Sequence, residues 1–204
     1  MLQLYLLNCS PLLQQPLLER AIALLPAQRR EKVQRIRIAE KKAQSAAAGL
    51  LLQHLFGAEK LSFGLNGKPF LSHTLDRYFN ISHSGQYVVC AVSDQDVGVD
   101  VEINSLIRAS VMRRCFTPTE QEWIQNDSKK FARLWTMKEA YMKLLGTGLS
   151  LPPLDIHLSM PPQSGFDAAH NCYWQFPEWD VPISLCSISD EPAEIIRLEI
   201  KDLL

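Results

Sequence analysis

The first half of the chain alternates between two spacings of hydrophobic residues. Apolar residues three or four positions apart predict helices, whereas apolar residues at every second position predict strands. The predicted helices cover 17–25 and 42–56, with a basic helical stretch between them. The predicted strands cover 2–7, 87–92 and 97–103, and the last two would pair as a hairpin around the turn at 93–96.

The second half has a similar content of helices and strands. Its strongest helical pattern runs from 129 to 145, after a helix start where Thr117, Pro118 and Glu120 can form a capping box. Strands are predicted at 155–159, 172–176, 183–189 and 195–200. Because both halves combine helices with strands, we predict an α+β fold with two lobes, 1–103 and 104–204, and a ligand crevice between them.

Composition then narrows the class of protein. The chain has 204 residues, of which 47% are hydrophobic and 21% charged, as in ordinary soluble globular proteins. Its net charge of -1 argues against nucleic-acid binding by the whole molecule. The five cysteines are scattered without a C-x-x-C pair, so neither a disulfide framework nor a zinc site is expected. No apolar run approaches the ~18 residues of a membrane span, so we expect a cytoplasmic protein.

Two acidic residues lie in a predicted strand that is otherwise apolar. In a strand over 97–103, Asp100 and Glu102 point to the same face, together with Gly98. Neighbouring carboxylates repel unless a cation or a shared proton separates them, and their oxygens suit Mg²⁺. Gly98 is expected to leave room beside them for a ligand. The alternative is an edge strand with an acidic face in solvent.

Three further groups could bind phosphate. Ser82, His83 and Ser84 precede Gly85 and offer two hydroxyls and an imidazole, although a histidine is often only structural. Glu139 and Lys143 lie four positions apart on one helix face, where they could simply form a surface ion pair. Between positions 19 and 42 the sequence has eight lysines and arginines but only three glutamates. This basic stretch indicates either a solvated helix or a site for an anion.

Three stretches, in this order and spacing, resemble the surfactin-type 4′-phosphopantetheinyl transferases. They are Asn80-Ile-Ser-His-Ser, Gly98-Val-Asp-Val-Glu, and 131–149 with Trp135, Lys138, Glu139, Lys143, Gly146 and Gly148. Each motif alone is weak, but three in register are specific, and the resemblance spans essentially the whole chain. The resemblance implies transfer of phosphopantetheine from coenzyme A to a serine of an apo carrier protein, with Mg²⁺ and release of adenosine 3′,5′-bisphosphate. It also implies a monomer with two pseudo-twofold-related α+β lobes and coenzyme A between them.

The resemblance also implies a role for each matching residue. The metal-binding carboxylates would be Asp100, Glu102 and Glu139, and Glu139 would also help to deprotonate the attacking serine. The phosphates of coenzyme A would be held by Ser82, His83 and Lys143 around the pyrophosphate, and by Arg29, Lys32 and Ser45 around the 3′-phosphate. Lys68 and Pro69 would lie beside the adenosine. The chain departs from the pattern at Gln44 and Ser45, where many relatives carry arginine.

Two other functions would use part of this pattern. A metal-dependent phosphohydrolase or nuclease also needs paired carboxylates, and a degenerate module could bind coenzyme A without catalysis. The presence of all three carboxylates and of Lys143 disfavours the second alternative.

The stretch 104–116 is the predicted contact for the carrier, which would come from fatty-acid, polyketide or nonribosomal-peptide biosynthesis. Its arginines would steer an acidic carrier, and its apolar residues would contact it. These residues are Arg108, Arg113 and Arg114, with Leu106, Ile107, Val111 and Met112. The alternative is a helix that packs on the core with its arginines in solvent.

Overall fold

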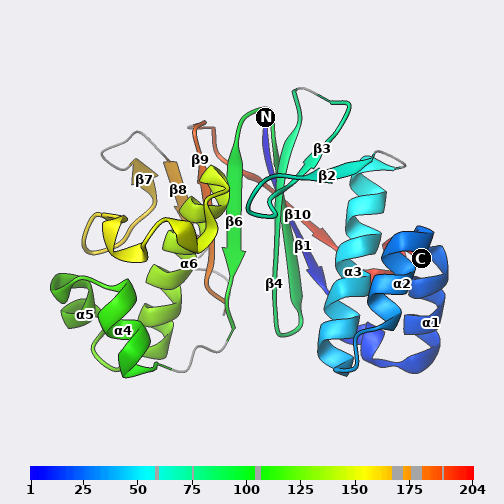
Figure 1. The fold of residues 1–204 in the computed structure, drawn as a ribbon, viewed down its shortest axis with the longest axis horizontal. Helices are drawn as coiled ribbons and strands as arrows, with labels where there is room; N and C mark the ends of the chain where they lie inside the picture. The colour runs from blue at the N-terminus through cyan, green and yellow to red at the C-terminus, as the bar shows by residue number, and fades with distance from the viewer. Residues whose placement is uncertain (58–59, 75, 104–106, 167–171, 176–180, 190) are drawn as a thin grey trace.

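The computed structural model describes residues 1–57, 60–74, 76–103, 107–166, 172–175, 181–189 and 191–204. The chain has a mixed α+β fold, as the sequence predicts (Figure 1). Helices α1 to α3 lie on one side of the central strands, and α4 to α6 lie on the other. Among the described residues, no helix combines the length and the apolar character needed to cross a membrane.

The first sheet has the strand order β10-β1-β5-β4. It comprises β1 (Leu2–Asn8), β4 (Tyr78–Ser84), β5 (Tyr87–Ser93) and β10 (Glu194–Leu198). The pair β1–β10 is parallel, and the other pairs are antiparallel. A hydrophobic core joins this sheet to α1 (Gln15–Leu24), α2 (Ala27–Gln34) and α3 (Ala39–Phe56). The short 3-10 helices η1 (Ser10–Leu13) and η4 (Ile200–Asp202) flank it.

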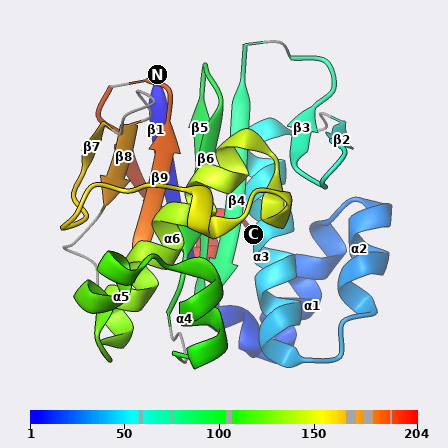
Figure 2. The ribbon, with the colours of Figure 1, turned by 60° about the vertical axis from the view of Figure 1, so that its left-hand side comes forward.

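The second sheet has the order β6-β9-β8-β7 and is antiparallel. Its strands are β6 (Val97–Val101), β7 (Gly165–Phe166), β8 (Cys172–Gln175) and β9 (Ile183–Ser187). Helix α6 (Ser128–Leu145) packs along β6 and β9 (Figure 2). A Cβ atom on Gly98 would lie 2.0 Å from the carbonyl oxygen of Ala140. The expectation that Gly98 leaves room for a ligand is therefore wrong, because α6 fills that space.

The remaining elements surround these two sheets. Between β6 and α6 lie α4 (Ala109–Cys115) and α5 (Pro118–Ile124), and α6 is followed by the 3-10 helices η2 (Gly148–Ser150) and η3 (Pro153–Asp155). A separate two-stranded hairpin consists of β2 (Leu61–Phe63) and β3 (Pro69–Leu71).

Strands β4 and β6 bring the two sheets together through side chains instead of a main-chain ladder. The Asn80 side chain accepts a hydrogen bond from the backbone N–H of Val99 (3.0 Å), and the Ser84 hydroxyl accepts one from Ile103 (3.1 Å). Between the sheets, the valines of β6 pack against apolar residues of β1 and β5. The polar residues of β4 therefore hold the strand that carries Asp100.

Three predictions about secondary structure are wrong. Strands β5 and β6 do not form a hairpin, because β1 and β4 already occupy both edges of β5 and β6 pairs with β9. The helix predicted over 17–25 does stop before Pro26, but the basic stretch that follows is not one helix, because α2 ends at Gln34 and the extended Ile38 precedes α3. The segment 155–159 is not a strand, because Pro153 begins a 3-10 turn there and the chain continues without pairing.

Candidate active site

A cleft of about 580 Å³ gathers the predicted site residues from helices α2, α3 and α6 and strands β3, β4 and β6. It is lined by Arg29, Lys32, Ser45, Pro69, Ser82, His83, Asp100, Glu102, Glu139 and Lys143, together with residues that include Lys41, Phe63 and Trp135. Of the residues predicted to bind coenzyme A or metal, Lys68 does not line this cleft. Segments more than a hundred positions apart in the sequence therefore converge on one site.

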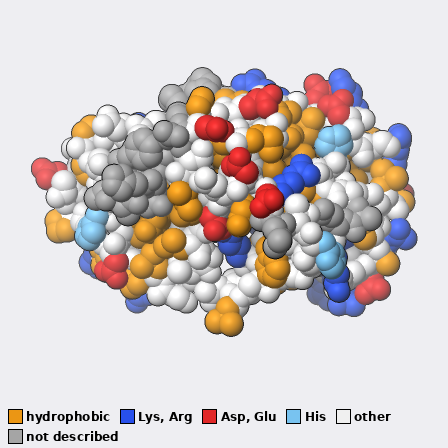
Figure 3. All heavy atoms as spheres, turned by 90° about the horizontal axis from the view of Figure 1, so that it is seen from above, with side chains coloured by type: hydrophobic (Ala, Val, Ile, Leu, Met, Phe, Trp, Pro, Cys, Tyr) orange, Lys and Arg blue, Asp and Glu red, His pale blue; other side chains and the backbone are white. Residues whose placement is uncertain are grey.

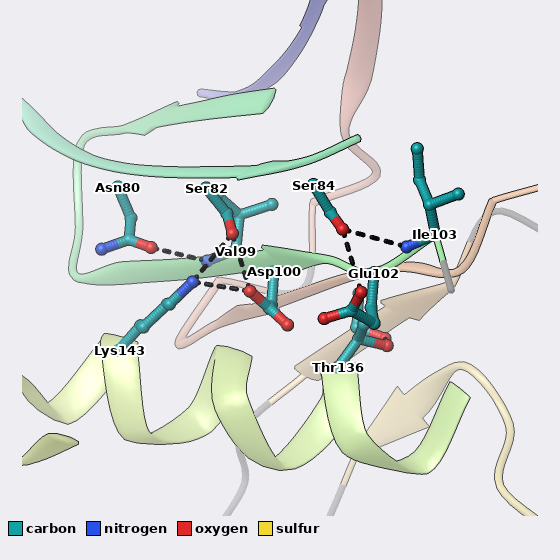
Figure 4. A network of polar contacts seen from close by, with 10 residues as sticks. Asn80, Ser82, Ser84, Val99, Asp100, Glu102, Ile103, Thr136 and Lys143 are labelled. Carbon is teal, nitrogen blue, oxygen red and sulfur yellow. Dashed lines mark hydrogen bonds and ion pairs between the residues drawn. The ribbon is translucent and has the colours of Figure 1, made fainter. Parts of the chain in front are cut away.

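Asp100 of β6 and Glu102, which directly follows this strand, face hydroxyl groups of the neighbouring strand β4 (Figure 4). The Asp100 Oδ1 atom accepts hydrogen bonds from the Ser82 hydroxyl (2.7 Å) and the Lys143 ammonium (2.6 Å). The Glu102 Oε1 atom accepts one from the Ser84 hydroxyl (2.9 Å). The alternation of β6 thus places both carboxylates on the face that looks toward α6, while its valines enter the core.

The third carboxylate, Glu139, comes from α6 and faces the same space. Its pKa is raised, first by burial and then by the negative charge of Asp100, and Lys143 partly opposes this change. Glu102 raises the pKa of Glu139 further. Asp100, Glu102 and Glu139 therefore bring three carboxylates into one cleft, where their negative charges repel one another. A divalent cation bound by their oxygens would relieve this repulsion.

The present side-chain arrangement does not form a complete metal site. Within the described ranges, no three carboxylate, imidazole or thiol groups lie close enough together to hold a metal ion. Asp100 is instead paired with Lys143, whose ammonium also donates to the Ser82 hydroxyl (2.9 Å). The alternative that the sequence left open, a surface ion pair of Glu139 with Lys143, is therefore not what the structure shows: Lys143 pairs across the cleft with Asp100. By charge and donor type, the three carboxylates fit Mg²⁺.

Positive charge gathers at the other end of the cleft. Arg29 donates to the backbone oxygen of Ser45 (2.9 Å), and its buried Nε atom has no protein partner. The pKa of His83 is lowered by partial burial and next by the positive charge of Lys41. Lys32 and Lys41 line the same end. A buried donor without a partner among several cations indicates an anion-binding site.

Lys41 is a cleft residue that the sequence reasoning missed. It lies four positions before Ser45, so both occupy one face of α3 and both line the cleft. That helical spacing could have identified it. Gln44 lies outside this set of cleft residues, and its amide donates to the backbone oxygen of Gly85 (2.7 Å). Gln44 thus supports the turn between β4 and β5, and Lys41 supplies a cation to the cleft.

Comparison with known proteins agrees with this arrangement. The family model of the 4′-phosphopantetheinyl transferase superfamily matches residues 96–190. The chain is 28% identical to the 4′-phosphopantetheinyl transferase Sfp of Bacillus subtilis (strain 168) over 207 residues, which cover 91% of this chain and 92% of that protein. A second 4′-phosphopantetheinyl transferase of Bacillus subtilis is 34% identical over 147 residues, 66% of each chain. The chain belongs to the 4′-phosphopantetheinyl transferase superfamily.

The relatives include eukaryotic proteins. The L-aminoadipate-semialdehyde dehydrogenase-phosphopantetheinyl transferase of Xenopus laevis is 32% identical over 148 residues, 59% of this chain and 49% of that protein. These comparisons confirm the family and the class of enzyme that the sequence motifs predict. The role of each site residue stays a prediction.

The two lysines of the family motif on α6 have different environments. Lys143 faces the cleft, whereas the side chain of Lys138 is fully buried and bonds Glu120 (2.8 Å). The Lys138 ammonium also donates to the backbone oxygens of Cys115 (2.9 Å) and Pro153 (2.8 Å). The predicted capping box at the start of α5 is confirmed, and its Glu120 is shared with this ion pair. Lys138 therefore fixes α4, α5 and η3 to α6 of the transferase.

In this transferase the neighbouring residues Lys68 and Pro69 face different parts of the molecule. Pro69 lines the cleft beside Leu61 and Phe63. The Lys68 ammonium turns away and donates to Asp96 (2.9 Å) and to the backbone oxygen of Leu144 (2.6 Å). Of the two predicted neighbours of the adenosine, only Pro69 is positioned to contact a ligand in the cleft.

Proposed function

We propose that this transferase moves 4′-phosphopantetheine from coenzyme A to a serine hydroxyl of an apo carrier protein and releases adenosine 3′,5′-bisphosphate. The observation that carries the proposal is a single cleft, lined by cations of α2 and α3 at one end and by three carboxylates beside Lys143 at the end formed by β6 and α6. Coenzyme A has a matching division of charge, because its 3′-phosphate lies apart from the pyrophosphate that must be cleaved. Arg29, Lys32 and Lys41 would hold the 3′-phosphate, with the backbone and hydroxyl of Ser45 beside them.

The residues at the acidic end supply the remaining functions. Asp100, Glu102 and Glu139 would hold Mg²⁺, which when bound polarises the pyrophosphate and stabilises the leaving bisphosphate. Lys143 would leave Asp100 and neutralise a pyrophosphate oxygen, with Ser82 and His83 donating to the same group. Glu139, placed beside the metal, would help to take the proton of the attacking serine.

The carrier would approach along α4. Arg108, Arg113 and Arg114 are exposed there, and no acidic residue of this helix neutralises them. Ile107, Val111 and Met112 are only partly available, because they pack against the core around Phe116. Leu106 lies outside the described residues. Docking on α4 would therefore rely more on the arginines than on the apolar contact that the sequence suggests.

The proposal includes the arrangement and setting of the enzyme. The lobes 1–103 and 104–204 would be related by pseudo-twofold symmetry, with β10 returning from the second segment to the first sheet. The enzyme would act as a monomer in the cytoplasm, a reducing compartment that suits the free thiols of Cys9, Cys90, Cys115 and Cys186.

The test is the intact mass of a panel of apo carriers after incubation with the enzyme, coenzyme A and Mg²⁺. Each modified carrier gains the mass of one phosphopantetheine. Asp100→Ala, Glu102→Ala and Glu139→Ala should each remove most of this gain and leave the fold intact. A variant that keeps the wild-type rate at saturating Mg²⁺ would exclude that residue as a ligand. Steady hydrolysis of coenzyme A without any carrier would favour a phosphohydrolase instead.

A further inference from the structure

Lys68 joins three parts of the molecule that are distant in sequence. It precedes β3 and donates to Asp96, which directly precedes β6, and to the backbone oxygen of Leu144 in the last turn of α6. Its side chain is 20% exposed, so the ammonium lies mostly under neighbouring atoms. Figure 3 views the molecule from above, where β6 begins, and acidic and basic side chains lie close together near the centre of this face.

A second residue of the same loop adds a parallel contact. The Asn66 amide donates to the backbone oxygen of Gly146 (2.9 Å). The last carbonyl groups of a helix have no partner within the helix, and a cation is favoured beside them. Asn66 and Lys68 therefore complete the C-terminal end of α6 from outside, and we refer to Asn66, Lys68, Asp96 and the Leu144 and Gly146 carbonyls as the Lys68 cluster.

The glycine at position 146 leaves room for this contact. It has a left-handed backbone conformation, with φ 67°, which ends α6. A Cβ atom at this position would lie 3.2 Å from Cδ of Lys68, closer than side chains normally pack. The first glycine of the motif that follows α6 therefore both ends the helix and accommodates the stem of Lys68.

The positions that the Lys68 cluster joins are those that carry the catalytic groups. Asp96 lies four residues before Asp100, and Leu144 directly follows Lys143. The hairpin that carries Lys68 also provides Phe63 and Pro69 to the wall of the cleft. One ammonium thus links the coenzyme-binding hairpin to the strand and to the helix of the acidic end.

We propose that Lys68 is a positioning residue that holds β6 and α6 at the spacing required for transfer and does not itself bind coenzyme A. The inference rests on the proposed function for its catalytic consequence. Displacement of catalytic groups by about 1 Å can cost ~100-fold in rate, so a partial loosening should cost about tenfold. Lys68→Met should therefore lower kcat about tenfold, with a smaller change in the Michaelis constant for coenzyme A. Lys68→Arg, which keeps the positive charge, should lower kcat less than Lys68→Met does.

A combination of variants separates positioning from ligand binding. If Lys68 and Asp96 act through one contact, Asp96→Ala should lower kcat less than Lys68→Met, and the double variant should resemble Lys68→Met. If Lys68 bound coenzyme A directly, Asp96→Ala would release it and leave the rate unchanged, while Lys68→Met would raise the Michaelis constant. That second pattern would overturn the proposal. Lys60→Met is the matched control, because Lys60 is an exposed lysine next to β2 in the same hairpin.

A measurement without substrate distinguishes failure of this inference from failure of the proposed function. Amide hydrogen exchange at Gly146 and Thr147, whose N–H groups bond the last turn of α6, should accelerate in Lys68→Met and not in Lys60→Met. Unchanged exchange in Lys68→Met would overturn the role of Lys68. Absence of transfer by the unsubstituted chain would overturn the proposed function, while the exchange result would still decide whether Lys68 secures α6.

Discussion

Replacement of Lys143 by alanine should affect both stability and transfer. In the structure its ammonium bonds Asp100 and Ser82, and the Asp100 side chain is only 9% exposed. Loss of a hydrogen bond to a charged group costs ~1.5–3 kcal/mol. Because 28% of the Lys143 side chain is exposed, solvent screening puts the loss near the lower end, about 1.5–2 kcal/mol. For a chain of this length, that lowers the melting temperature by roughly 3–8 °C.

The same substitution should lower the rate of transfer at least a hundredfold, which corresponds to ~2.7 kcal/mol. A surface ion pair worth ~0.3–0.5 kcal/mol could not produce that effect. The assay is the rate of mass gain of an apo carrier at saturating coenzyme A and Mg²⁺, with Lys129→Ala, an exposed lysine of the same helix, as control. A loss below about threefold would show that Lys143 does not contact the transferred group, and an unchanged melting temperature would contradict its contact with Asp100.

Three other predictions test the two ends of the cleft and the carrier surface. Burial raises the pKa of Glu139 above 4.5, so its contribution to stability is present below that pH and is lost as the pH rises through the folded-state pKa. In EDTA, the melting temperature of Glu139→Gln should therefore lie above that of the wild type at about pH 7 and equal it at about pH 4. Equal melting temperatures at both pH values would show that the pKa of Glu139 is not raised in the folded protein. Joint replacement of Arg29 and Lys32 by alanine should raise the Michaelis constant about tenfold for coenzyme A and little for 3′-dephospho-coenzyme A, whereas equal effects would refute 3′-phosphate binding. Reversal of Arg113 and Arg114 to glutamate should raise the Michaelis constant for the carrier and weaken its salt dependence; carrier kinetics that stay as in the wild type would place docking elsewhere.

Local patterns in the sequence predicted most of the helices and strands. The strand at β1 and the helices at α3 and α6 agree with prediction to within a few residues, and Gly57 and Gly146 follow the two long helices as expected. Pairing between strands was not predictable in the same way. Alternation identifies β5 and β6 as strands, but the neighbours of a strand depend on segments far away in the sequence, here β1 and β9.

For the candidate site, too, the sequence predicted which residues belong to it better than it predicted their contacts. Most of the predicted site residues lie together in one cleft because strand alternation and helix spacing fix which face each side chain occupies. Lys68 was predicted beside the adenosine together with its neighbour Pro69, and Pro69 does line the cleft. The sequence does not show that the long side chain of Lys68 instead turns toward the end of α6. The buried pair of Lys138 with Glu120 was missed because it joins two helices through their tertiary packing.

The parallel pairing of β1 with β10 has a consequence for synthesis of the chain. Gln3 lies opposite Glu194, and Leu7 lies opposite Leu198, so one edge of β1 finds its partner only after translation has passed Leu198. Until then, β1 can pair with β5 and still present an open edge, which is a template for association with other chains. The nascent protein thus keeps this edge exposed to association until β10 leaves the ribosome, and the sheet that contains β1 is completed after the sheet of β6 to β9.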